Sequence, residues 1–300
     1  VPAAKAPYAA AKAEGYYKDR PTREIAVLQL MRGEPSDNSR GFRLGNSAQA
    51  NIAIKEEIMA GLLGQKPVSL HTPVFSEATV APLTVRHWEG RQIYTRSLGL
   101  ALLEAARRLD PALRVRLGPS RGTVQIVEVA GAEGLDREAL AGSLLAAMER
   151  LVAADTPIRQ EWWTVEEALA HFLEQGWDDA ARLLHPRPQA TVPLGCCGDL
   201  YALSMGPLLP STGSLRGFRL EPHPDGLVLD YGPIDPRNGR RAPSPPPREA
   251  GMMRDHRTWL GGLGVTSVGA FNDRCISGQV SQIIRVAEGF HEKRIGQIAD

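Results

Sequence analysis

The residues best suited to hold a ligand lie in residues 206–220, GPLLPSTGSLRGFRL. Two prolines fix φ there and three glycines allow positive φ, so the stretch predicts a shaped loop that leads into a strand. Its candidate anion-binding residues are Ser211, Thr212, Gly213 and Arg216. Hydroxyls, backbone N–H groups and a guanidinium can together hold a phosphate or an RNA backbone. The alternative is a tight loop whose hydroxyls satisfy its own backbone.

Two further arginines, Arg91 and Arg96, belong to the same set of anion-binding candidates. They lie near the start of a predicted helix, where each could face an anion or pair with a nearby carboxylate. Aromatic side chains offer a weaker signal. The tryptophans at positions 162, 163, 177 and 259 have no spacing typical of RNA-binding motifs, which favours core or interface positions for them.

No combination of residues predicts catalysis or metal binding. His291 and Glu292 lie on a predicted helix, but the second histidine of a metalloprotease helix is missing because position 295 is Ile. Cys196 and Cys197 have no His or Asp beside them in the sequence, which disfavours a nucleophile. We therefore predict no catalytic residue, no metal site and no cofactor in this chain.

Composition limits the classes of protein that fit. The chain has 300 residues, 43% of them hydrophobic, and a formal net charge of +1. This charge gives no global field that would gather nucleic acid or an anionic membrane, although local patches could do so. The three cysteines do not resemble a disulfide framework, and no apolar run approaches the roughly 20 residues of a membrane helix. We expect a soluble protein with ordinary cores in a reducing compartment.

Residues 1–22 differ from the rest of the chain. They are rich in alanine, carry several basic residues and show no apolar periodicity, so we expect them to be loosely ordered. Such a segment resembles the mature end or the flank of a transit peptide, which would place the protein in an organelle matrix or stroma. A chain that begins part-way along explains it equally well, and the expected compartment is then the cytoplasm.

The elements that must position these residues follow from periodicity and turn signals. Strands are predicted at residues 25–31, 42–44, 68–70 and 81–85, the last at a sheet edge because of Pro82. Asn46 or Ser47 can cap a helix that ends near Gly64. Helices at residues 95–109 and 136–153 have apolar stripes, and they flank strands at 115–117 and 123–129 joined by a turn at 118–122. With a strand at 158–162, these elements predict a sheet with helices on one side.

The remaining residues predict a mixed region that ends in helices. Thr164 and Glu167 match a capping box at the start of a helix, and a short helix follows at 178–184. Four strands are predicted at residues 191–194, 201–204, 218–221 and 227–231, then a proline-rich surface loop at 233–248. Helices at 254–263, 268–277 and 281–299 complete the chain. The fold class predicted for the whole is α+β.

Three separated motifs carry a resemblance to a known family. They are residues 90–98, GRQIYTRSL; residues 206–213, GPLLPSTG, with Leu215 and Phe218; and a tail with VAE at 286–288, HEKRI at 291–295 and IAD at 298–300. In order and spacing they resemble bacterial-type uridine kinase-like proteins, or nucleoside kinases. In that family a half related to threonyl-tRNA synthetase precedes a P-loop kinase. The resemblance extends along roughly residues 60–300.

The resemblance implies a domain organisation. It makes residues 23–85 a divergent TGS domain and residues 86–160 a counterpart of the synthetase's second additional domain. Residues 161–300 become a family-specific α+β region that ends where a kinase domain would begin. The His-Ser pair that family members have in the hairpin is absent from residues 118–122, and the histidine and cysteine spacing of the synthetase editing site is absent too.

A phosphate-binding loop of the type GxxxxGK[ST] is also missing from the sequence, so these 300 residues cannot phosphorylate a nucleoside by that mechanism. We expect a non-catalytic regulatory, binding or assembly module, a subunit of a protein complex or ribonucleoprotein. One alternative is the accessory half of an ATP-dependent uridine or nucleoside kinase that continues past residue 300, with ATP and magnesium as its cofactors. Another is a module that binds RNA directly; nucleotide binding stays open.

Overall fold

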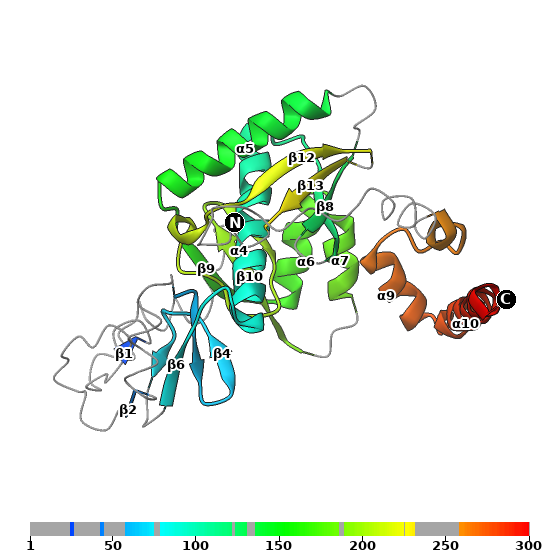
Figure 1. Ribbon diagram of the computed structural model, residues 1–300, viewed down its shortest axis with the longest axis horizontal. Coiled ribbons are helices and arrows are strands. Elements are labelled where there is room, and N and C mark those ends of the chain that lie inside the picture. The colour runs from blue at the N-terminus through cyan, green and yellow to red at the C-terminus, as the bar shows by residue number, and fades with distance from the viewer. Residues whose placement is uncertain are drawn as a thin grey trace. The chain divides into compact units, whose positions relative to one another are not determined.

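The computed structural model describes residues 25–26, 43–44, 58–74, 79–121, 124–130, 136–185, 189–224, 226–231 and 258–299. The chain divides into two compact units: unit 1 comprises residues 1–162 and 193–244, and unit 2 comprises residues 163–192 and 245–300. Helices and mainly antiparallel sheets together confirm the α+β class (Figure 1). The predictions for residues 1–22 and 233–248 lie outside the described residues. The domain boundaries implied by the family resemblance stay predictions.

The first part of unit 1 is built from short strands. A four-stranded sheet has the order β2-β6-β3-β4, and a separate antiparallel pair joins β1 and β5. Their bounds are Ile25–Ala26 for β1, Arg43–Leu44 for β2, Ala60–Leu63 for β3, Lys66–Val68 for β4, Pro73–Val74 for β5 and Thr79–Leu83 for β6. The helix predicted up to residue 63 is therefore wrong over β3. Gly64 has φ of 61°, which suits a hairpin turn as well as the helix end that its sequence suggested.

The edge position predicted for the strand with Pro82 is also wrong. β6 lies between β2 and β3, and Pro82 is paired with Gly61 of β3. The described pairing with β2 covers only Thr79 and Val80. Proline has no N–H to donate, and within the described residues the pairing on the β2 side ends at Val80, before Pro82.

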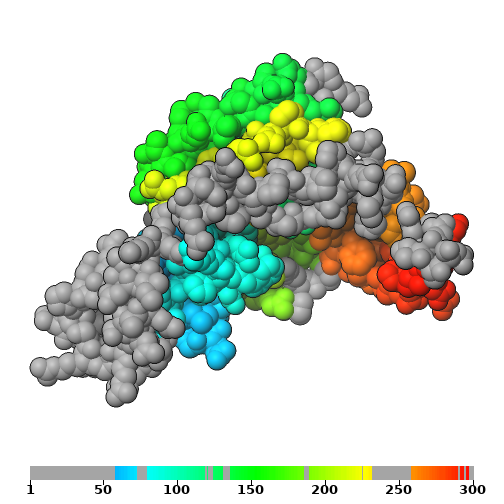
Figure 2. Space-filling model, viewed as in Figure 1, coloured from blue at the N-terminus to red at the C-terminus, as the bar shows by residue number. Residues whose placement is uncertain are grey.

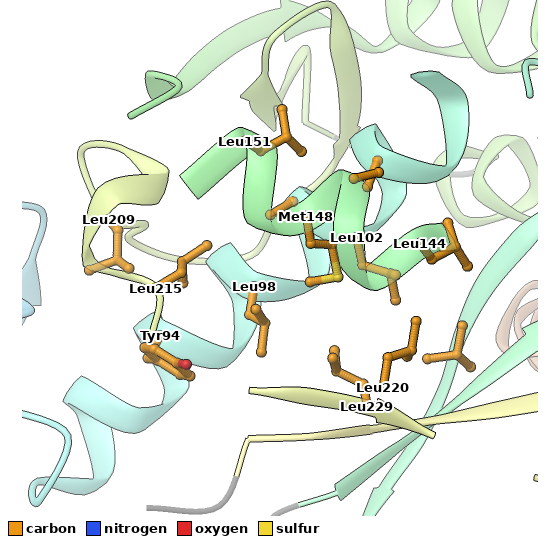
Figure 3. Packing of buried hydrophobic residues seen from close by; sticks show 14 of the residues in the cluster. Tyr94, Leu98, Leu102, Leu144, Met148, Leu151, Leu209, Leu215, Leu220 and Leu229 are labelled. Carbon is orange, nitrogen blue, oxygen red and sulfur yellow. The ribbon is translucent and has the colours of Figure 1, made fainter. Parts of the chain in front are cut away.

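Two helices and a second four-stranded sheet enclose the main core of unit 1. α4, Trp88–Leu109, packs against α5, Arg137–Ala153, and the sheet has the order β12-β13-β8-β7. Its strands are β7, Val115–Arg121; β8, Val124–Val129; β12, Arg219–His223; and β13, Gly226–Asp230. Figure 2 shows the green side chains of α5 against the yellow side chains of β12. Leucines of both helices and of the sheet meet in one cluster (Figure 3).

The hairpin differs from its prediction. β7 continues through Arg121, so residues 118–121 are strand and not turn, with a register irregularity between Leu117 and Ser120. Gly118 fits this bulge because a Cβ there would lie 3.1 Å from the Ile126 carbonyl oxygen. The side-chain amide of Gln125 donates to the Gly118 carbonyl at 3.1 Å. Glycine and proline thus mark a bulge here, which the sequence alone does not distinguish from a turn.

A third sheet holds the strand that was expected to join the helix-covered sheet. β9, Ile158–Thr164, belongs to the order β11-β10-β9, with β10 at Thr191–Cys197 and β11 at Leu200–Leu203. That part of the sequence prediction is wrong, because β9 finds its partner more than thirty residues later in the chain. β10 and β11 form a tight hairpin in which Cys197 is paired with Leu200, and Gly198 has φ of 60°. Long-range pairing of this kind leaves no signal in the sequence near the strand.

Unit 2 is helical. α6 spans Val165–Glu174, α7 Asp178–Leu184, α9 Val268–Ile276 and α10 Val280–Ala299, and residues 258–262 are also helical. The capping box predicted for Thr164 and Glu167 is confirmed, since each side chain accepts from the backbone N–H of the other residue. Phe172 is fully buried and its ring stacks on Trp177 with centroids 5.9 Å apart. None of the helices in the described part of the chain has the length and hydrophobicity needed to span a bilayer.

Candidate functional site

The predicted loop lies between β11 and β12, and its first half is held by α4. The backbone N–H of Leu209 donates to the Ser97 hydroxyl at 2.9 Å, and Ser97 in turn donates to the Ile93 carbonyl at 2.8 Å. Arg96 Nη1 donates to the Pro207 carbonyl at 3.1 Å. Burial lowers the pKa of the Arg96 guanidinium. Of the six candidate residues, Arg96 therefore already has a hydrogen-bond partner in the loop, the Pro207 carbonyl.

The second half of the loop is held by the end of α5. Thr212 is fully buried, and its hydroxyl donates to the Leu151 carbonyl at 2.6 Å. The backbone N–H of Gly213 donates to Asp155 Oδ1 at 2.9 Å. A Cβ at residue 213 would lie 2.3 Å from that oxygen, so a larger residue there would have to displace the Asp155 carboxylate. Thr212 and Gly213 thus use the groups that were expected to meet an anion for contacts within the chain.

The other candidates lie toward the outside. Arg91 and Arg216 are exposed, and Ser211 is half-buried. The Tyr94 hydroxyl of α4 donates to the Arg216 carbonyl at 2.6 Å, which fixes the backbone of Arg216 beside that helix. The candidates therefore separate into an inner set, Arg96, Thr212 and Gly213, and an outer set. In the outer set, Arg91 lies on the exposed side of α4, whereas the Arg216 backbone is attached to Tyr94, which is buried in the core.

Sequence reasoning missed Trp88, the first residue of α4. Trp88 is 65% exposed, although tryptophan has one of the largest apolar side chains. The helix was expected to begin near residue 95, so Trp88 was not placed on any helix face. The usual start signal is absent because the N-cap residue is His87, which makes no side-chain capping hydrogen bond. A tryptophan three residues before Arg91 was the only signal available.

A buried carboxylate organises the other end of α4. Glu104 is fully buried and accepts hydrogen bonds from Arg107 Nε at 2.7 Å, Arg107 Nη2 at 3.1 Å and Arg108 Nε at 2.7 Å. Arg107 also pairs with Asp199 at 3.3 Å. The hydrogen bond to Glu104 raises the pKa of Arg107. This cluster ties the end of α4 to the β10–β11 hairpin, and its charges neutralise one another.

The adjacent cysteines are both fully buried thiols on β10. Arg159 Nη2 lies 3.1 Å from Cys196 Sγ, and that sulfur donates to the Gly198 carbonyl at 3.3 Å. Burial raises the pKa of Cys196, and burial raises the pKa of Cys197 to about 12. Thiols with raised pKa values are poor nucleophiles. Within the described residues, no three His, Cys, Asp or Glu side chains gather so as to hold a metal ion.

We expect a thiol reagent at about pH 8 to modify Cys275, which is exposed, and to leave Cys196 and Cys197 intact until the protein unfolds. Peptide mapping after alkylation identifies the modified residue, and Cys275→Ser removes the fast reaction. Rapid alkylation of Cys196 or Cys197 in the folded protein would contradict this prediction.

Burial of the Cys197 thiol also predicts a pH dependence of stability. Because the pKa of Cys197 is raised from 9.0 to about 12, its contribution to the free energy of unfolding is complete below pH 9 and declines as pH rises toward 12.

Comparison with known proteins points to one kind of enzyme. No protein-family model matches the chain. A threonine–tRNA ligase of Halorhodospira halophila is 28% identical over 168 residues, which is 56% of this chain and 26% of that protein. Threonine–tRNA ligase 1 of Bacillus subtilis is 30% identical over 175 residues, which is 58% of this chain and 27% of that protein. The chain thus spans about a quarter of the length of these curated relatives.

A third relative matches a larger share of the chain. The threonine–tRNA ligase of Symbiobacterium thermophilum is 28% identical over 198 residues, or 65% of this chain. These similarities support the threonyl-tRNA synthetase-like part of the family resemblance. They give no support to its kinase part, because these relatives are tRNA ligases.

Proposed function

We propose that unit 1 is a synthetase-like module that binds RNA of the tRNA class and carries out no reaction on it. The observation that carries the proposal is the similarity, over more than half of the chain, to threonine–tRNA ligases of several bacteria. Those enzymes are named for their action on threonine and tRNA. The similarity covers only about a quarter of their length, so we propose RNA binding for this chain and do not propose the ligase reaction.

The loop is a surface fixed by contacts within the chain and not an anion-binding cradle. Thr212 and Gly213 direct their hydroxyl and N–H to Leu151 and Asp155, and Arg96 holds the Pro207 carbonyl. These contacts shape the loop and connect it to both helices of the core. Arg91 and Arg216 keep exposed positions on the outside. A module of this kind needs no cofactor and acts as one part of a larger ribonucleoprotein or protein complex.

The test is a binding titration with a threonine-specific tRNA transcript, read by fluorescence anisotropy over a series of salt concentrations. We expect saturable binding that weakens as salt rises, with a slope of log K against log salt of about −0.7 to −0.9 for each phosphate contact. The near-neutral net charge of +1 predicts a small number of such contacts. A tRNA for another amino acid, titrated in parallel, measures specificity. No binding even at low salt would refute the proposed function.

A further inference from the structure

The start of α4 carries an exposed aromatic ring and an exposed guanidinium group side by side. Trp88 is 65% exposed, and Arg91 is exposed. Trp88 and Arg91 are three residues apart on one helix, so they are neighbours on its surface with Cβ atoms roughly 5–6 Å apart. We call these two residues the Trp88 face. It combines a large apolar ring in water with positive charge, an arrangement that a hydrophobic core does not require.

The turn before α4 holds Trp88 rigidly. His87 N–H donates to the Thr84 carbonyl at 3.0 Å, and Thr84 N–H donates to His87 Nδ1 at 3.0 Å. Arg86 N–H donates to the Thr84 hydroxyl at 3.3 Å. A Cβ at Gly90 would lie 2.1 Å from the Thr84 carbonyl oxygen, so only glycine lets the turn approach the helix this closely. The backbone that presents Trp88 is therefore fixed before any ligand arrives.

Arg216 does not belong to this face. The Tyr94 hydroxyl donates to the Arg216 carbonyl at 2.6 Å, and Tyr94 is only 6% exposed and packs in the core cluster. This hydrogen bond fixes the backbone of Arg216, whereas Arg91 is the arginine that the helix places beside Trp88.

We propose that the Trp88 face binds an unpaired nucleotide of the RNA, with a base stacked on the Trp88 ring and the adjoining phosphate against Arg91. This inference rests on the proposed function and adds the contact surface and the mode of recognition. Unpaired bases stack on aromatic side chains, and arginine holds the phosphate oxygens through paired N–H groups. A base-paired duplex keeps its bases stacked internally and offers the ring nothing to stack on.

The experiment compares full-length variants for binding to the threonine-specific tRNA, to a short single-stranded RNA and to a blunt duplex of the same sequence. We expect Trp88→Ala to weaken binding of the tRNA and the single strand by roughly 5- to 100-fold and to leave weak duplex binding unchanged. Arg91→Ala should reduce the magnitude of the salt slope by about one contact, 0.7 to 0.9. Trp88→Phe should retain most of the affinity, since phenylalanine also stacks.

Two matched controls come from the same unit. Trp162 is 54% exposed on β9, and Arg150 is exposed on α5. Trp162→Ala and Arg150→Ala should leave the affinity within about twofold of the wild type. Circular dichroism melts check that each variant is folded.

The outcomes separate the two proposals. Wild-type protein that binds none of the RNAs overturns the proposed function and this inference with it. Wild-type binding that survives Trp88→Ala and Arg91→Ala, or that falls equally with Trp162→Ala, overturns the inference alone. Equal binding of duplex and single strand overturns the stacking mode. Losses confined to the Trp88 face and to unpaired RNA support both.

Discussion

Replacing Arg107 and Arg108 together with alanine should lower the free energy of unfolding of unit 1 by about 3–5 kcal/mol. Both arginines donate to Glu104, whose side chain is fully buried. The double substitution leaves that carboxylate in the interior without a partner, and an unpaired buried charge is among the most costly defects in a fold. Thermal and urea unfolding, followed by the circular dichroism of the helices, measure the loss.

The geometry also predicts that removing the two arginines and removing Glu104 have unequal costs. The side chains of Arg107 and Arg108 are 36% and 48% exposed, so water can solvate them if Glu104 is removed instead. Arg108→Ala alone should cost less than the double substitution because Arg107 still donates twice. Adding Glu104→Gln to the double variant should recover part of the stability, since a neutral amide costs less to bury than a carboxylate.

The control is the exposed pair of Arg116 and Glu128 on the β7–β8 hairpin. Arg116→Ala should change the free energy of unfolding by about 0–1 kcal/mol, as is typical of surface ion pairs. A double variant at Arg107 and Arg108 that is no less stable than Arg116→Ala would show that Glu104 is hydrated or neutral in the folded protein. The Gln substitution would then give no recovery.

Much of the fold could be predicted because its helices follow local rules. The apolar stripe of α5 and the Thr164 capping box are properties of neighbouring residues, and the structure has both. The wrong predictions fall where pairing with distant segments determines the structure. Gly64 and Gly118 each permit several backbone shapes, and the partners of β3 and β7 determine which one forms. β9 was assigned to the wrong sheet for the same reason, since nothing near residue 158 indicates pairing with β10.

The candidate site shows the same division. The sequence indicated that residues 206–220 form a shaped loop, but it could not indicate that Thr212 donates to Leu151, 61 residues earlier. Trp88 was missed because the start of α4 lacks a side-chain cap, so the helix face that contains Trp88 and Arg91 could not be drawn. Local chemistry predicts which groups are available. Long-range hydrogen bonds decide which of them are used within the fold.

Phe172→Ala should lower the free energy of unfolding of unit 2 by about 3–5 kcal/mol. Phe172 is fully buried, with its ring stacked on Trp177 at 5.9 Å and within 9° of parallel. The substitution opens a cavity in a small unit whose described residues include few other large buried side chains. Leu173→Ala is the matched control, because Leu173 is the next residue of α6 and is 55% exposed. Its effect should stay within about 0.5 kcal/mol.

Hydrogen exchange shows where the stability is lost. Amides of α6, α7 and α9 should lose protection in Phe172→Ala, while those of α4 and α5 keep it, because the two groups belong to different compact units. Burial lowers the pKa of His171 below its ordinary 6.5, so unfolding takes up a proton as pH falls past that value and acid weakens this unit further. Measurements above about pH 7 avoid this contribution. If α4 and α5 lose protection to the same extent as α6, the chain unfolds as one cooperative body, and RNA binding by unit 1 must then be tested only in variants that leave unit 2 intact.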